Sequence, residues 1–165
     1  MTIVSIDTES IESDKNDAQS MITLLDEELK NAGEEDWKIV FGHHPIYSGG
    51  SHSGSDIIEE RALSIMEHYD VDFYLAGHDH NLQHWVKLGG VRGIDHVVSG
   101  GGGKSEYEMD IDNVEKTQEK GMELKFFDKH YGFAYFVVSK NEINVQFVKA
   151  DPYCEVEYEF TRYRY

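Results

Sequence analysis

Apolar residues in the first half of the chain recur with the spacing of alternating strands and helices. Residues 17–31 and 56–69 carry apolar positions at helical spacing, and Gly33 supplies the end of the first helix. The polar stretch 8–16 predicts a loop. The short apolar runs that predict buried strands are residues 2–7, 37–41 and 71–76. Strands and helices therefore alternate, which is an α/β pattern.

The second half of the chain follows a period of two. Residues 133–138 and 143–148 form a predicted hairpin about Lys140-Asn141, and residues 104–125 are charged and weakly periodic, typical of a surface excursion or a ragged helix. The other predicted strands are residues 85–88, residues 93–98 and a last strand through Val156, Tyr158 and Phe160. The second half is thus β-rich and antiparallel. The fold class is α/β (α+β), without internal repeats or a domain linker.

Composition narrows the function. The 165 residues are 39% hydrophobic and carry a net charge of −17, which opposes non-specific binding to nucleic acid and to anionic membranes. A phosphate site in such a protein needs a locally positive pole, most simply bound cations. The single cysteine, Cys154, excludes an internal disulfide framework and a cysteine metal cluster. No apolar run approaches the roughly 20 residues of a membrane span.

Two glycine–histidine motifs follow two consecutive strands. Gly42-His43-His44-Pro45 comes after the second strand, and Gly77-His78-Asp79-His80 after the third. A lone histidine at a strand end usually bonds to backbone, but two such motifs at adjacent strand ends favour a transition-metal site. The His-Asp-His segment is expected to be extended, which places the imidazoles of His78 and His80 on one side while Asp79 points elsewhere. His43, His78 and His80 are the candidate metal ligands.

Other polar residues near the two histidine motifs are predicted to support the site. His44 should point away from His43 on an extended segment, which makes it a packing or rim residue. His52 lies on a Gly/Ser loop, either as an exposed residue or as a substrate-binding or acid group overhanging the site. Asn81 and Gln83 are expected to organise the loop through amide hydrogen bonds. The histidines without a predicted role are His68, His84, His96 and His130.

Two further patterns have simpler interpretations. The glycines at 100–103 lack the spacing of a phosphate-binding loop, and they predict a close backbone turn beside the site. The acidic stretches 34–36, 106–108 and 110–112 lack the spacing of a calcium-binding loop and predict solvated surface.

Two longer segments carry a family resemblance. Residues 40–48 (VFGHHPIYS) and 74–83 (YLAGHDHNLQ) resemble the purple acid phosphatases, and the match is closest to the tartrate-resistant type within the calcineurin-like metallophosphoesterases. Residues 98–102, 131–135 and 6–8 resemble that family's later glycine turn, GGFAY-type strand and IDT strand. The correctly ordered GHxP and GHDH pair is the specific part of the match.

The resemblance implies a fold, a cofactor and a reaction. The family fold is a β-sandwich of two mixed sheets flanked by helices, and its site holds iron(III) bridged to iron(II), zinc or manganese. By resemblance, His43 and His78 bind the second metal and His80 binds the iron. His52 matches a histidine near the substrate phosphate. The implied reaction is hydrolysis of phosphate monoesters.

The chain departs from the family in its ligand set. The family's two aspartates, iron-binding tyrosine and asparagine come from D-x-x, GD-x-x-Y and GNHD blocks. This sequence has no Gly-Asp dipeptide and no Gly-Asn-His. Residues 1–165 are therefore expected to be the C-terminal half of the domain, with the N-terminal half needed to complete the site. Alone, the chain should bind metal weakly and hydrolyse little. The family is often secreted or vacuolar (lysosomal). The alternatives are a non-catalytic scaffold or binding protein of the same fold, and a single-metal hydrolase that uses only the histidines.

Overall fold

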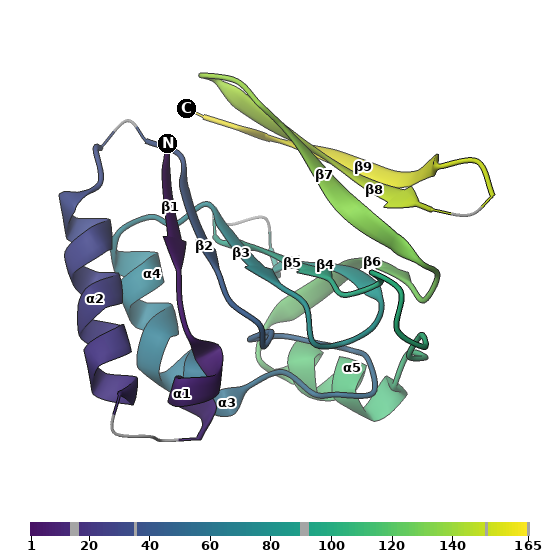
Figure 1. Ribbon diagram of the computed structural model, residues 1–165, viewed down its shortest axis with the longest axis horizontal. Helices are drawn as coiled ribbons and strands as arrows, with labels where there is room; N and C mark the ends of the chain where they lie inside the picture. Colours follow the sequence, from purple (N-terminus) through teal and green to yellow (C-terminus); the bar gives the residue numbers. More distant parts are fainter. Residues whose placement is uncertain (14–16, 35, 90–92, 151, 165) are drawn as a thin grey trace.

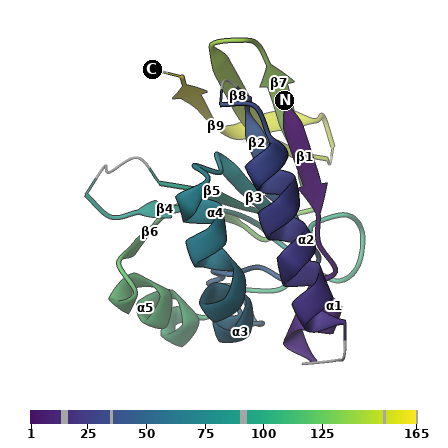
Figure 2. The same cartoon turned by 90° about the vertical axis from the view of Figure 1, so that its left-hand side faces the viewer.

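The described part of the chain forms two β-sheets, with helices covering the outer face of the larger one (Figures 1 and 2). A computed structural model describes residues 1–13, 17–34, 36–89, 93–150 and 152–164. Glu35 of the acidic stretch 34–36 lies outside these residues. The predicted α/β class with a sandwich of sheets is confirmed. Among the described residues, no helix is long and apolar enough to cross a membrane.

The larger sheet has six strands in the order β1-β2-β3-β5-β4-β6. Its strands are β1 (Thr2–Ser5), β2 (Lys38–Phe41), β3 (Phe73–Ala76), β4 (Leu82–Lys87), β5 (Asp95–Ser99) and β6 (Met122–Asp128). Strands β1, β2, β3 and β5 run parallel, whereas β4 is antiparallel to both of its neighbours. The smaller sheet is the antiparallel set β7 (Gly132–Val138), β8 (Glu142–Lys149) and β9 (Glu155–Tyr163). The predicted hairpin is thus β7–β8.

The described residues also form five α-helical segments and one π-helical turn. They are α1 (Thr8–Glu12), α2 (Ala18–Asn31), α3 (Asp56–Ile58), the π-helical turn η1 (Glu59–Leu63), α4 (Ser64–His68) and α5 (Ile111–Glu119). The last three elements before β3 form one continuous helical segment, where the sequence predicts a single helix. Helix α5 is regular and begins at the cap Asp110, whose side chain accepts the N–H of Asn113.

The polar stretch 8–16 was predicted as a loop, and this was wrong for its first part. Asp7 accepts hydrogen bonds from the backbone N–H groups of Glu9 and Ser10 at 3.1 and 3.2 Å, so it caps a short helix, α1. Asp14 and Asn16, also assigned to that loop, lie outside the described residues. The cap matters for the site because it begins the helix at Thr8, directly after β1.

Two apolar cores lie on the two faces of the six-stranded sheet. One core fills the space between this sheet and the helices, and its fully buried members include Leu25, Met66 and Trp85. The second core lies between the two sheets and includes Phe73 and Val97 of the larger sheet. On the smaller sheet the inward alternation of β8 is confirmed, since Ile143, Val145 and Phe147 are each fully buried.

Four loops meet at one edge of the larger sheet because β1, β2, β3 and β5 are parallel. Their carboxyl ends lead into Thr8, Gly42, Gly77 and Gly100. This edge is where parallel sheets usually present binding groups, and both glycine–histidine motifs lie there.

Candidate metal and phosphate site

Thr8 holds the first histidine motif in a turn. Its Oγ1 accepts the backbone N–H groups of both His43 and His44, each at 3.0 Å, and it lies 3.0 Å from Nδ1 of His44. Gly42 is required for this approach because a Cβ there would lie 2.3 Å from Cγ2 of Thr8. The sequence did not reveal the role of Thr8, which lies 35 residues before His43.

The turn overturns the expected direction of His44. Residues 42–45 are not extended, so the rings of His43 and His44 do not diverge; their centroids are 4.9 Å apart in an edge-to-face arrangement. The His44 and His78 centroids lie 4.6 Å apart. His44 therefore belongs to the histidine cluster rather than to its packing surroundings.

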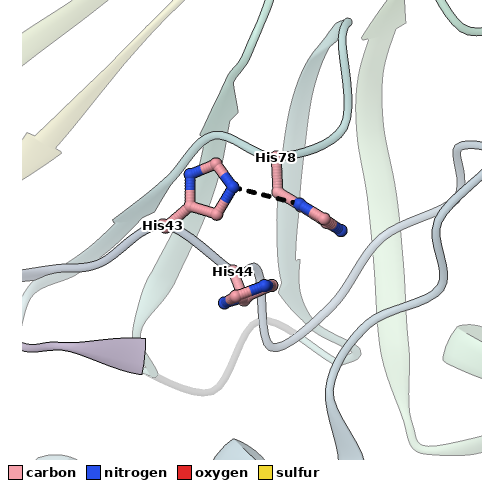
Figure 3. A group of neighbouring side chains, drawn as sticks. All are labelled: His43, His44 and His78. Atoms are coloured by element: carbon pink, nitrogen blue, oxygen red, sulfur yellow. Dashed lines mark hydrogen bonds between the residues drawn. The ribbon is translucent and has the colours of Figure 1, made fainter. Parts of the chain in front are cut away.

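His43 and His78 approach each other directly (Figure 3). Nε2 of His43 and Nδ1 of His78 are 3.1 Å apart. Two nitrogen ligands of a tetrahedral zinc ion stand about 3.3 Å apart, given metal–nitrogen bonds of about 2.0 Å. One nitrogen from each of His43, His44 and His78 lies within 4.8 Å of the others. The two strand-end motifs thus converge as expected.

The His-Asp-His segment is a tight turn, not an extended strand. His78 has a positive φ of 64°, a strained conformation for a non-glycine residue. The N–H of Asp79 bonds back to the carbonyl of Gly77 at 2.7 Å. The expectation that His78 and His80 share one side of an extended segment was therefore wrong, and the two rings face different partners.

His80 packs against the loop after β5. Its ring stacks on Tyr107 with a centroid separation of 4.2 Å and an interplanar angle of 16°. Its Nδ1 lies 2.9 Å from the carbonyl oxygen of Ser105. A carbonyl only accepts, so Nδ1 of His80 carries the hydrogen and Nε2 keeps a free lone pair. This is the arrangement usual for a metal-binding histidine.

The sequence did not indicate that Tyr107 contacts the site, because the acidic stretch 106–108 predicts solvated surface. Its N–H also donates to the carbonyl of His80 at 3.1 Å. The ring lies 5.1 Å from that of His52, and His52 lies 4.5 Å from that of His78. Tyr107 and His52 therefore connect His80 to the cluster of His43, His44 and His78.

His52 is exposed on the loop after β2 and lines an open cavity of about 600 Å³. His44 and His78 line the same cavity. The N–H of His52 donates to Oδ1 of Asp79 at 3.1 Å, which fixes the loop at this point. His52 thus overhangs the site, as one of its two predicted roles requires.

A buried polar network supports these loops from below. Asp79, Asn81 and Gln83 are fully buried, and Asp79 accepts a hydrogen bond from the hydroxyl of Ser48. Gln83 accepts the N–H of Gly49 at 2.8 Å and donates to Asn81 at 2.7 Å and to Ser48 at 2.8 Å. The expectations that Asp79 points away from the histidines and that the two amides organise the loop are confirmed.

Burial favours the neutral form of two histidines in the cluster, His44 and His78. Burial, followed by the neighbouring histidines, lowers the pKa of His78 to about 4. Burial also lowers the pKa of His44. Neutral imidazoles retain the lone pair that a metal needs.

These residues fit one part of a metal centre. His43 and His78 have the right spacing for a shared ion, and His80 presents a free Nε2 nearby. Within the described part of the chain, however, no carboxylate oxygen joins the histidine group. A two-metal centre needs such oxygen ligands between its ions, so the donor set in this chain matches one side of it.

Comparisons with known proteins agree with this geometry. The family model described as calcineurin-like phosphoesterase matches residues 2–82. A second model, iron/zinc purple acid phosphatase-like protein C, matches residues 93–156. The two matches together take in both histidine motifs and strands β7 and β8 of the smaller sheet.

Curated relatives are phosphatases that are longer than this chain. Purple acid phosphatase 3 of Arabidopsis thaliana is 37% identical over 111 residues, which are 67% of this chain and 28% of that protein. Tartrate-resistant acid phosphatase type 5 of Homo sapiens is 30% identical over 137 residues, 81% of this chain and 40% of that protein. The chain thus spans well under half the length of these relatives.

Solved structures share the fold. GAP50, the anchor in the inner membrane complex of Plasmodium, has a TM-score of 0.76 at 25% identity over 98% of this chain and 48% of that chain. A purple acid phosphatase from yellow lupin (Lupinus luteus) seeds has a TM-score of 0.67 at 19% identity over 87% of this chain and 28% of that chain.

Proposed function

Because the chain belongs to the purple acid phosphatase group of the calcineurin-like phosphoesterases, we propose that it supplies the histidine side of a dinuclear phosphomonoesterase centre. The supporting observation is the 3.1 Å approach of Nε2 of His43 to Nδ1 of His78 at adjacent strand ends. The substrate class is the phosphate monoesters, bound in the cavity next to these histidines.

Each histidine has a distinct role in this proposal. His43 and His78 hold one metal, and His80 offers Nε2 to the other, iron(III), with iron(II), zinc or manganese as the partner ion. The bound pair would supply Lewis-acid stabilisation of phosphate oxygens and acidify a water. His52 overhangs the cavity and donates a hydrogen bond to the phosphate or to the leaving group.

The remaining ligands lie outside this chain in the proposal. Aspartates, a tyrosine and an asparagine from the N-terminal half of the domain complete the site, since the histidine group includes no carboxylate among the described residues. The family membership also supports a secreted or vacuolar (lysosomal) location for the whole protein.

The test is metal content and hydrolysis of 4-nitrophenyl phosphate by the protein that carries this chain. His78→Ala should lower kcat/KM by about a hundredfold or more, because it removes a ligand of the metal that stabilises the transition state. The control is His68→Ala, an exposed histidine at the end of α4. Full activity in His78→Ala, or hydrolysis by the protein without bound metal, would contradict the proposal.

A second candidate function is a non-catalytic scaffold or binding protein. It is favoured by the likeness to GAP50, an anchor protein, which covers nearly the whole chain. A scaffold has no need of convergent imidazoles, so it predicts that His43→Ala, His78→Ala and His80→Ala leave partner binding unchanged and that no metal co-purifies. If the purified protein contains stoichiometric metal and these variants lose it, the result would favour the enzyme over the scaffold.

A further inference from the structure

His44 is a wall residue of the candidate substrate cavity for which neither the sequence nor the family resemblance gave a chemical role. It lines the cavity of about 600 Å³ together with His52 and His78, and its ring packs 4.9 Å from His43 and 4.6 Å from His78. Figure 3 shows the three rings grouped around one space. What His44 does there depends on which ring nitrogen carries its hydrogen.

The hydrogen bonds of Thr8 determine that position. The hydroxyl oxygen of Thr8 has two lone pairs and one hydrogen. The backbone N–H groups of His43 and His44 both donate to this oxygen at 3.0 Å, so both lone pairs are used. The hydroxyl hydrogen is then the group left to pair with Nδ1 of His44, also at 3.0 Å.

Nδ1 of His44 is therefore an acceptor, and the ring hydrogen is on Nε2. A neutral imidazole has one donor and one acceptor nitrogen. His80 has the opposite arrangement, because the carbonyl of Ser105 requires a hydrogen on its Nδ1. Two histidines near the same cavity are thus held in opposite tautomers: His80 presents a lone pair, and His44 presents an N–H.

We propose that His44 is a substrate-binding residue whose Nε2–H donates to a phosphate oxygen in the cavity, and that Thr8 fixes it in this donor form. The proposal rests on the proposed phosphatase function and adds a residue to it. Hydrogen bonds to a charged oxygen are among the stronger ones in proteins. A donor fixed in advance needs no rearrangement when the anion binds.

The competing interpretation makes His44 a third metal ligand. One of its nitrogens lies within 4.8 Å of ligand atoms of His43 and His78, close enough for three imidazoles to meet after small shifts. Metal binding through Nε2 would need the lone pair on that atom, which reverses the tautomer set by Thr8. The two roles therefore predict opposite hydrogen positions on one ring.

Nitrogen-15 NMR of the histidine side chains in the protein that carries this chain distinguishes the two. We expect the Nε2–H tautomer for His44 at neutral pH and the Nδ1–H tautomer for His80. Inorganic phosphate added to the zinc-loaded protein should shift the His44 Nε2 resonance. His44→Phe should weaken phosphate binding about tenfold, and His44→Gln, which keeps an N–H near the Nε2 position, should restore most of it.

Zinc affinity supplies the independent control. In the protein that carries this chain, His44→Phe should bind zinc as the unsubstituted protein does, whereas His43→Phe should bind it much more weakly. His68→Phe serves as the surface control. Three results would each overturn the proposal. They are an Nδ1–H tautomer at His44, an equal loss of zinc affinity in His44→Phe and His43→Phe, and no shift of the His44 resonance on addition of phosphate. Failure of hydrolysis with these results intact would count against the phosphatase function alone.

Discussion

A single aromatic contact positions His80, and it can be removed selectively. Tyr107 stacks on the His80 ring at 4.2 Å. Because the stack holds the ring, Tyr107→Ala should lower the zinc affinity of the protein that carries this chain about tenfold, as expected for the loss of a group that orients a ligand. Tyr107→Phe keeps the ring and should preserve the affinity. Isothermal titration with zinc measures both, and an equal effect of the two substitutions would contradict the stacking role.

The glycine run at 100–103 offers a matched pair of positions, Gly100 and Gly102, that differ in the space around a Cβ. A Cβ at Gly100 would lie 1.8 Å from the carbonyl oxygen of Asp79, whereas at Gly102 nothing lies within 4 Å. Gly100→Ala should therefore lower the free energy of unfolding by about 3 kcal/mol or more and disturb the His78–His80 turn. Gly102→Ala should change it by less than about 0.5 kcal/mol. Urea denaturation of the two variants gives the comparison, and similar curves would show that the backbone at Gly100 relaxes freely.

At the residue scale, the sequence predicted those site residues whose neighbours in the chain form a recognisable pattern. His43 and His78 were found because a glycine and an apolar run precede each of them. The direction of His44 was not predictable, since it depends on a hydroxyl 36 positions earlier in the chain. Tyr107 was missed for a similar reason: its contact with His80 spans 27 positions, and its acidic neighbours are typical of surface.

At the scale of elements, a buried charge network connects the two sheets. Arg162 of β9 donates to Asp95 of β5 at 2.6 Å and to Asp72, before β3, at 3.0 Å, and His84 of β4 lies 2.9 Å from Asp95. Burial alone would raise the pKa of Asp95, but His84 and Arg162 together lower it below its usual value of 3.8. The charged form is therefore favoured in the folded protein.

Asp95→Asn should lower the free energy of unfolding by about 2 kcal/mol at neutral pH, because Arg162 then loses one of its two buried carboxylate partners and keeps Asp72. The folded pKa is depressed, so the contribution of Asp95 is present above its unfolded pKa and is lost as the pH falls through the folded value. The difference between the variant and the unsubstituted chain should thus shrink below about pH 4. Urea titrations across this pH range test the prediction. The control is Glu157→Gln, a substitution of an exposed residue of β9. A pH-independent difference would exclude the charge as its cause.

The elements themselves were predictable where hydrophobic periodicity was strong. The alternation of β8 and the helical spacing of α2 each fixed an element and its buried face. Two elements were missed because polar residues obscured their patterns. Helix α1 depends on the Asp7 cap. Strand β6 begins in the charged stretch 104–125 and continues beyond it, although Met122, Leu124 and Phe126 alternate along it. No local sequence pattern indicated that the smaller sheet packs on the larger one.

At the scale of the whole molecule, the acidic charge opposes the proposed ligand. A phosphate ion approaches a chain with a net charge of −17, and it is attracted only within the short range of the metal-loaded histidine cluster. The Debye length is about 30 Å at 0.01 M salt and about 8 Å at 0.15 M. At low salt the approaching anion therefore experiences the repulsion of the entire chain, and at physiological salt mainly that of the groups around the cavity.

Added salt should consequently accelerate phosphate binding, the reverse of ordinary electrostatic steering. We expect the association rate constant of inorganic phosphate with the zinc-loaded protein to rise severalfold between about 0.01 M and about 0.15 M sodium chloride. Imidazole, a neutral metal ligand, should associate at a rate independent of salt, which controls for effects on the metal. Stopped-flow measurements of both ligands test the argument. A phosphate rate that falls with salt would mean that the local positive pole controls the approach, and that the acidic surface lies too far from the cavity to matter.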